Sequence, residues 1–312
     1  MAFQDFLNKF KTDKRYLIGG VIVIGLILFM IIGSLDQGET PTDELPKTNQ
    51  ATLDFWAKIR ANDPVQLSGE WKNPTWLEVN SDLWEDGAYI TGDGNTLYFV
   101  IYQGDLIKDI QTGNLKGELD VYMSQKPFRE KSKAPISEKI WAEGGVMISG
   151  NDIYYMSNKY SQDGKYDTDI YKNGVRLSFN TAEDEDDPHY CAAKDELYFW
   201  KKDGGDSNIY VYANGEVKKL PSPINTAGTD IQPFLTPDCQ TMYFTSDRDG
   251  NPAIYKAQRA GERWEKPTKM ISSKIAVGEP TLTDDGKYLY FIQVFRSDDG
   301  VFTSDVMFVE RK

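Results

Sequence analysis

Histidine and cysteine are nearly absent from this chain of 312 residues, which has one histidine and two cysteines. The sequence therefore has no Cys/His cluster of the kind that holds structural or catalytic zinc. It also lacks a glycine-rich phosphate loop and the Gly-x-Ser-x-Gly motif of serine hydrolases. Any Ser-His-Asp or Cys-His site would have to use His189, which we expect to be a structural residue of a strand.

Basic residues are too few to balance the acidic ones, and the formal net charge is -13. Residues 1–16 carry +2, from four basic and two acidic side chains, and residues 17–34 carry none, so the remainder carries -15. Nucleic acids and anionic lipids are recognised by net positive surfaces. The sequence therefore predicts no nucleic-acid partner and is typical of an acidic extracytoplasmic domain.

Only one long run lacks charge, residues 17–34. A helix of this length, at ~1.5 Å per residue, just spans a hydrocarbon core of ~30 Å. Basic residues precede the run and acidic residues follow it, so the positive-inside rule predicts a cytoplasmic segment over residues 1–16 and an extracytoplasmic remainder. A cleaved signal peptide is the alternative, but Ile, not a small residue, precedes the plausible cut.

Residues 35–64 follow the predicted anchor and begin with a stretch rich in Thr, Pro, Glu and Asp, which is typical of a solvated tether. Residues 52–62 form a possible short helix with Thr52 as its cap and Leu53, Phe55, Trp56 and Ile59 on one side. We expect this helix to pack on the following domain. Docking of a partner at the membrane surface is the alternative.

Residues 65–312 repeat one phrase five times. An aromatic pair recurs with gaps of 56, 44, 45 and 47 residues, at Tyr98-Phe99, Tyr154-Tyr155, Tyr198-Phe199, Tyr243-Phe244 and Tyr290-Phe291. Short aromatic and β-branched runs with Gly/Asp turns at this period indicate propeller blades of four strands each. In the fourth repeat, residues 232–236, 242–246 and 253–257 are predicted strands, and residues 264–267 open the outer one.

The ring is predicted to close with a strand from the N-terminal side. The last repeat ends at Lys312 after its third strand, while residues 71–74 reproduce the pattern of residues 264–267, with Trp first and Pro last. We therefore expect residues 69–80 to supply the fourth strand of the last blade. The predicted fold is an all-β, five-bladed β-propeller without open edges, preceded by one transmembrane helix.

These repeats resemble the TolB-type β-propeller family. The segments that carry the resemblance are residues 233–238 with 243–247, and residues 280–286 with 290–291. Cys239 replaces the turn glycine of the pattern, and Glu143-Gly144-Gly145 stands where proline is expected. The resemblance implies the fold and a role in binding and assembly, and it implies little about activity.

A ring of polar residues is predicted around the channel. Alignment of the repeats at the residue just before the inner-strand Pro or Gly gives Asp86, Glu143, Asp187, Gln232 and Glu279, and His189 follows closely in its strand. Clustered oxygen ligands would suit calcium or a polar ligand, so calcium is the one candidate cofactor. The alternative is that an acidic residue at this position caps the strand by accepting a backbone N–H.

Other features carry weaker predictions. Residues 163–169 and 247–251 have the spacing of calcium loops, although Asp/Gly turns between strands produce such strings routinely. The acidic run 183–187 is expected to be a solvated loop, with recruitment of a basic partner as the alternative. Cys191 and Cys239 lie one blade apart and three places out of register, so we expect two free thiols and keep a disulfide as the alternative.

Two functions remain open on the sequence alone. The first is a single-pass membrane protein that presents a non-catalytic propeller to a protein partner, as an accessory subunit of a membrane complex. The second is a carbohydrate-binding or glycoside-hydrolase-like propeller whose channel carboxylates act on a sugar. A carboxylate pair in an aromatic-lined pocket would favour the second function, and a plugged channel would favour the first.

Overall fold

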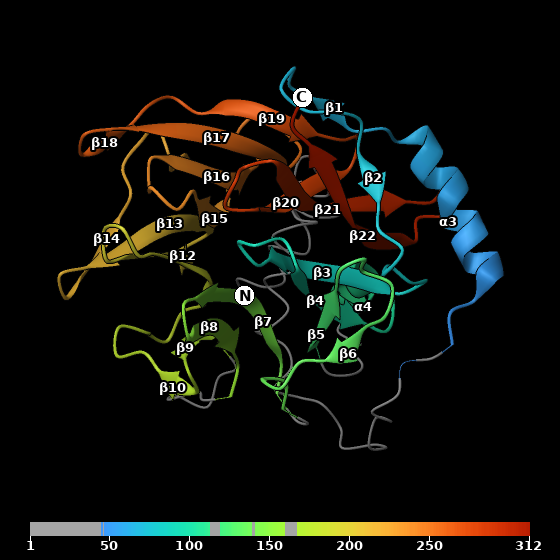
Figure 1. Ribbon diagram of the computed structural model, residues 1–312, viewed down its shortest axis with the longest axis horizontal. Helices are drawn as coiled ribbons and strands as arrows, with labels where there is room; N and C mark the ends of the chain where they lie inside the picture. Colours follow the sequence, from blue (N-terminus) through green and yellow to red (C-terminus); the bar gives the residue numbers. More distant parts are fainter. Residues whose placement is uncertain (1–44, 46, 113–118, 139–140, 160–166) are drawn as a thin grey trace.

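Each of the five aromatic repeats forms one antiparallel β-sheet, and the sheets surround a common axis (Figure 1). The structure is a computed structural model that describes residues 45, 47–112, 119–138, 141–159 and 167–312. The predicted five-bladed β-propeller is thereby confirmed. The predicted cytoplasmic segment 1–16, the predicted membrane span 17–34 and most of the tether lie outside the described residues.

The first three blades consist of consecutive strands. Blade 1 contains β3 (Trp84–Ile90), β4 (Thr96–Tyr102), β5 (Asp120–Gln125) and β6 (Ser132–Lys133). Blade 2 contains β7 (Glu143–Ser149), β8 (Asp152–Ser157), β9 (Asp169–Lys172) and β10 (Val175–Arg176). Blade 3 contains β11 (Glu185–Cys191), β12 (Glu196–Asp203), β13 (Asp206–Ala213) and β14 (Glu216–Lys219).

Blades 4 and 5 each recruit a strand from the N-terminal side. Blade 4 contains β15 (Asp230–Leu235), β16 (Thr241–Ser246), β17 (Ala253–Ala260), β18 (Arg263–Trp264), β19 (Thr268–Ser272) and β1 (Gln66–Leu67). Blade 5 contains β20 (Ala276–Leu282), β21 (Tyr288–Arg296), β22 (Phe302–Glu310) and β2 (Thr75–Trp76). In each blade the first strand lies nearest the axis. The two strands recruited from the N-terminal side, β1 and β2, lie at the outer edges of blades 4 and 5.

The predicted closure of the ring is confirmed. Strand β2 pairs with β22, with Thr75 opposite Phe308 and Trp76 opposite Met307, and Trp71 forms a further bridge to Arg311. Strand β1 adds a fifth strand outside β19, which the sequence did not predict. The N-terminal segment therefore covers the edges of two neighbouring blades and not one.

The hydrophobic core lies between the blades. The phenylalanine of the aromatic pair is fully buried in four of the described second strands, at Phe99, Phe199, Phe244 and Phe291. One cluster of buried hydrophobic residues contains Phe99 of blade 1 together with Tyr290 and Ile292 of blade 5. Side chains of neighbouring sheets thus interdigitate around the whole ring, and burial of these aromatic faces drives its assembly.

Two helices accompany the sheets in the described residues, α3 (Gln50–Asn62) and α4 (Leu106–Thr112). Helix α3 starts two residues before the predicted position, and its cap is Asn49, whose Oδ1 accepts the backbone N–H of Ala51 at 3.0 Å. The predicted cap Thr52 is wrong, because Thr52 lies inside the helix. Neither helix is long and apolar enough to cross a membrane.

Helix α3 packs on blade 5, as expected. Trp56 is buried, and Arg60 forms an ion pair with Asp305 at 2.8 Å while it lies over the ring of Trp76. Asp63, which follows the helix, accepts the backbone N–H of Lys274 at 3.2 Å. These contacts hold α3 against the ends of β21 and β22 and against the chain that enters β20.

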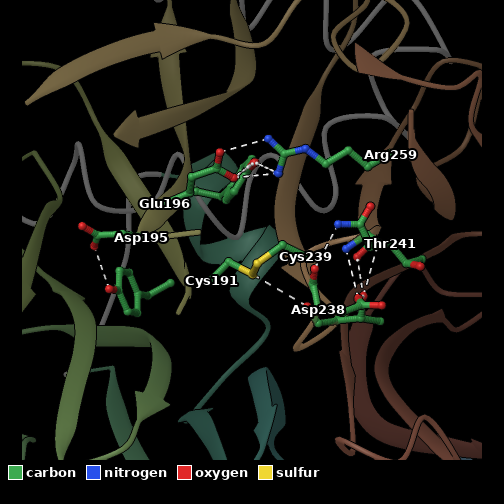
Figure 2. The surroundings of a disulfide bond; sticks show 11 residues. Cys191, Asp195, Glu196, Asp238, Cys239, Thr241 and Arg259 are labelled. Atoms are coloured by element: carbon green, nitrogen blue, oxygen red, sulfur yellow. Dashed lines mark hydrogen bonds and ion pairs between the residues drawn. A yellow bond between two sulfur atoms is a disulfide. The ribbon is translucent and has the colours of Figure 1, made fainter. Parts of the chain in front are cut away.

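Cys191 and Cys239 form a disulfide between blades 3 and 4, so the prediction of two free thiols is wrong (Figure 2). Their Cα atoms are 6.0 Å apart. Cys239 has a left-handed φ of 57° in the turn between β15 and β16. This turn conformation directs a Cβ toward the preceding blade, since a Cβ built at the equivalent Gly94 would lie 3.0 Å from Thr283. Spacing along the strands could not reveal that direction.

Candidate functional site

A left-handed residue interrupts every inner strand at the axis. These residues are Gly87, Gly145, Asp187, Gln232 and Glu279, with φ between 47° and 61°. In each blade the pairing of the first two strands shifts at this point, which is the geometry of a β-bulge. The bulges define the true alignment of the blades. Asp86 lies one residue before its bulge and Glu143 two residues before, so the alignment made from the sequence was out of step in blades 1 and 2.

Four of the predicted ring residues meet at the axis. Gln232 donates from Nε2 to Glu279 Oε1 at 3.0 Å, and Glu279 donates its backbone N–H to Gln232 Oε1 at 3.1 Å. Glu279 also forms a side-chain hydrogen bond with Asp86. The negative charge of Asp86 acts on Asp187 as well. Asp86, Asp187, Gln232 and Glu279 are called the axial cluster below.

Each aspartate of the axial cluster has an indole partner. Trp84 donates from Nε1 to Asp86 at 3.0 Å, and Trp200 donates from Nε1 to Asp187 at 2.8 Å. Both indoles are buried. The carboxylates are therefore fixed by neutral donors, and no ion pair neutralises them among the described residues.

Burial controls the protonation of the axial cluster. Desolvation raises the pKa of Asp187 to about 7 and raises that of Asp86. It raises the pKa of Glu279 well above its usual value, and the nearby charges of Asp86 and Asp187 add to the effect. This raised pKa favours the protonated form of Glu279, whose carboxyl O–H can donate in the hydrogen bond with Asp86.

Glu143 does not join the axial cluster, so its predicted place in the ring is wrong. Its carboxylate accepts the backbone N–H of Glu138 at 3.2 Å and the hydroxyl of Ser157 at 3.3 Å. Burial raises the pKa of Glu143 to about 8. The side chain therefore stabilises the entry to its strand, and this is the capping role that we kept as the alternative for the whole ring.

The same capping role falls to the residue two positions before the bulge in three other blades. These residues are Glu85, Glu185 and Asp230, and all are buried. Thr181 donates its backbone N–H to Glu185 at 2.8 Å, and Thr226 does so to Asp230 at 2.6 Å. These three residues were not predicted from the sequence, although a Ser or Thr stands four residues before each of them.

The capping residue Glu185 and its neighbours overturn the interpretation of the acidic run 183–187 as a solvated loop. Asp184, Glu185 and Asp186 are all buried, and β11 begins at Glu185. Lys201 pairs with Glu185 at 2.9 Å, just as Arg248 pairs with Asp230 at 2.6 Å. Within this run Glu185 is the capping residue and Asp187 belongs to the axial cluster.

His189 lies beside the axis, two residues beyond the bulge of blade 3. It is buried, its ring centre is 4.5 Å from that of Phe234, and burial lowers its pKa to about 4. A neutral imidazole packed on a neighbouring blade agrees with the structural role expected for it. Whether any of the predicted ring residues binds a ligand stays a prediction.

The space along the axis widens from one end to the other. Beside the axial cluster the cavities hold only about 10 Å³ and about 50 Å³. Where the inner strands end, the channel opens into a cavity of about 390 Å³ lined in part by Tyr89, His189, Tyr190 and Phe234. This cavity is called the funnel below. Ligand pockets typically hold ~300–1,000 Å³, so the funnel has the volume of a binding site and the two cavities beside the axial cluster do not.

No group of three or more acidic, histidine or cysteine side chains is arranged for a metal ion in the described part of the chain. The predicted calcium loop at residues 247–251 engages protein groups instead. Asp247 accepts the backbone N–H of Thr229 at 2.8 Å, and Asp249 accepts the hydroxyl of Tyr255 at 2.8 Å. Most of the other candidate loop, residues 163–169, lies outside the described residues.

No family model matches the sequence, and no curated protein matches it. Solved structures of similar fold include a protein described as a TolB from Agrobacterium tumefaciens, with 12% identity, a TM-score of 0.46 and coverage of 80% of this chain and 98% of that one. TolB from Acinetobacter baumannii gives 14% identity, a TM-score of 0.41 and coverage of 91% and 79%. A glycoside hydrolase has 7% identity and a TM-score of 0.47, with coverage of 84% of this chain and 96% of that one. At such identities these similarities concern the fold alone.

Proposed function

We propose that the chain is a single-pass membrane protein that presents its propeller outside the cytoplasm as a non-catalytic module for binding a protein, as an accessory subunit of a membrane complex. The anchor is the uncharged run 17–34, and the basic residues before it set the orientation. The disulfide supports this placement, since such bonds persist in oxidising compartments.

One observation favours binding over glycoside hydrolysis: the axial carboxylates are closed off. A glycosidase needs an acid and a base or nucleophile on either side of a bound sugar. The cavity that touches Asp187 and Glu279 holds about 50 Å³, well below the ~300 Å³ of the smallest typical ligand pocket. The carboxylates are also occupied by Trp84, Trp200 and Gln232.

The proposal is tested by isolating the full chain, with an affinity tag at Lys312, from cross-linked native membranes. We expect one partner protein to be retained in a fixed ratio through size-exclusion chromatography. A tagged chain of residues 1–50 is the control, because it keeps the predicted anchor and lacks the propeller. Recovery of the full chain alone, or of the same partner with residues 1–50, would contradict the proposal.

Orientation is tested separately with protease added to intact cells. We expect cleavage between residues 36 and 50, which frees a fragment containing the propeller. A propeller that becomes accessible only after lysis would reverse the assigned orientation. Turnover of a glycoside that disappears in Glu279→Gln would establish the alternative function instead.

A further inference from the structure

The funnel differs from the rest of the channel in its chemistry. Its lining includes Tyr89, Tyr190 and Phe234 from three different blades and Met147 from a fourth, beside polar residues. The rings are held by aromatic neighbours: the ring centre of Tyr190 lies 5.4 Å from that of Tyr154 in a stacked pair, and that of Phe234 lies 4.5 Å from that of His189 in a tilted pair. A ligand would therefore meet preformed ring faces, which lowers the entropy lost on binding.

The charge of the funnel has one sign. Asp93 and Asp284 lie on its rim, and among the described residues that line it none is a lysine or arginine. Both carboxylates act electrostatically on the hydroxyl of Tyr89. His189, deeper in the wall, is neutral at physiological pH because its pKa is lowered to about 4. Aromatic faces beside uncompensated carboxylates form a favourable environment for a cation.

Two basic residues lie near this rim. Lys126 and Lys287 line a neighbouring depression that also includes Asp93 and Asp284, and their ammonium groups are 5.7 Å and 5.0 Å from the ring centre of Tyr288. In the described residues neither Asp93 nor Asp284 forms an ion pair with them. The carboxylate of Asp284 is also free of the turn-forming hydrogen bonds that Asp93 accepts from Thr91 and Asn95.

The funnel is also well placed for a partner. It opens where the inner strands end, at the turns that follow them, such as residues 91–95 and 283–287. Helix α3 contacts the opposite ends of the strands, at Lys274 and Asp305. Helix α3 therefore lies on the face opposite the funnel.

We propose that the funnel binds a basic segment of the protein partner, with a lysine or arginine side chain on the aromatic wall and its charge beside Asp284. The inference rests on the proposed function and adds the chemistry of the partner to it. The narrowing to about 50 Å³ at the axial cluster stops the segment in the funnel, so it lies across the mouth and does not thread the channel.

Binding of a fluorescent tetralysine peptide to the full chain in detergent, followed by fluorescence anisotropy, tests the proposal. We expect binding that weakens at high salt and that is lost when the lysines are acetylated. Asp284→Lys should weaken it by about tenfold or more, because it adds a like charge at the rim. Asp298→Lys is the matched control. It makes the same change at an exposed residue near α3 on the opposite face, and it should leave the affinity unchanged.

Three results would overturn the inference: equal binding of a tetraglutamate peptide, equal loss of affinity in Asp298→Lys, or equal affinity for free spermidine, which would make any polyamine a sufficient ligand. The same two variants are then compared in the isolation from native membranes. A partner retained equally by Asp284→Lys and the wild type would refute the basic segment while leaving the proposed function intact. Absence of any partner would refute the proposed function itself.

Discussion

Substitution of Asp187 by asparagine should make the propeller less sensitive to rising pH. The folded-state pKa of Asp187 is raised from 3.8 to about 7 by burial. A carboxyl group with a raised folded-state pKa contributes stability that is fully present below its unfolded-state pKa, and this stability is lost as the pH rises through the folded-state value. The wild-type chain should therefore be less stable at about pH 8 than at about pH 5.

The size of the effect follows from the shift. Between about pH 5 and about pH 7 the unfolded chain has already released the Asp187 proton, while the folded chain keeps it. The free energy of unfolding therefore falls by roughly 3 kcal/mol between about pH 5 and about pH 8. In a domain of this size that free energy corresponds to roughly 6–12 °C in melting temperature. The fall in melting temperature between about pH 5 and about pH 8 should therefore be smaller in Asp187→Asn than in the wild type, by roughly 6–12 °C.

Asparagine suits the site for two reasons. Its side-chain oxygen can accept the Trp200 indole N–H that Asp187 accepts at 2.8 Å. It also tolerates the left-handed φ of 47° better than most residues. Asp195→Asn is the matched control, because Asp195 has a φ of 54° and lies exposed in a turn of the same blade. Equal pH dependence in the wild type and Asp187→Asn, or the same change in Asp195→Asn, would refute the reasoning.

Three further predictions concern stability, each measured by thermal melting. Trp71→Ala should cost about 3–5 kcal/mol, since it empties a buried site in the closing segment, and a melting temperature equal to that of the wild type would argue against closure by this segment. Cys191→Ser should cost about 4 kcal/mol for a bond that joins residues 48 apart, and a reducing agent should lower the wild-type melting temperature but not that of the variant. Asp63→Ala should cost about 1–2 kcal/mol by leaving the Lys274 N–H without its acceptor, whereas exposed Asp54→Ala should change little.

The period of the aromatic pairs was sufficient to predict the blades, because each pair lies in a second strand whose phenylalanine fills the space between sheets. Phe99 and Phe291 are examples, both fully buried. The closing strand was equally predictable. A blade that ends at its third strand must find a fourth, and the Trp71 pattern identified it.

The candidate site was harder to predict because its alignment depends on backbone conformation, which residue types reveal only in part. Proline marked the bulges at Asp187, Gln232 and Glu279 correctly. In blades 1 and 2 the glycine itself occupies the left-handed position, at Gly87 and Gly145. Alignment on the residue before the first glycine therefore selected Asp86 and Glu143, one and two positions too early.

The capping set also explains why α3 belongs to the propeller. Blades 1 to 4 place an acidic residue two positions before the bulge, whereas blade 5 has Val277 there, whose side chain can accept no hydrogen bond. Asp63 supplies the missing carboxylate from outside the blade, and its backbone oxygen accepts Gln293 Nε2 at 2.8 Å. Because the fifth blade is both closed by β2 and capped by Asp63, the segment after Asn49 is an integral part of the fold. The tether predicted from the sequence therefore does not extend into α3.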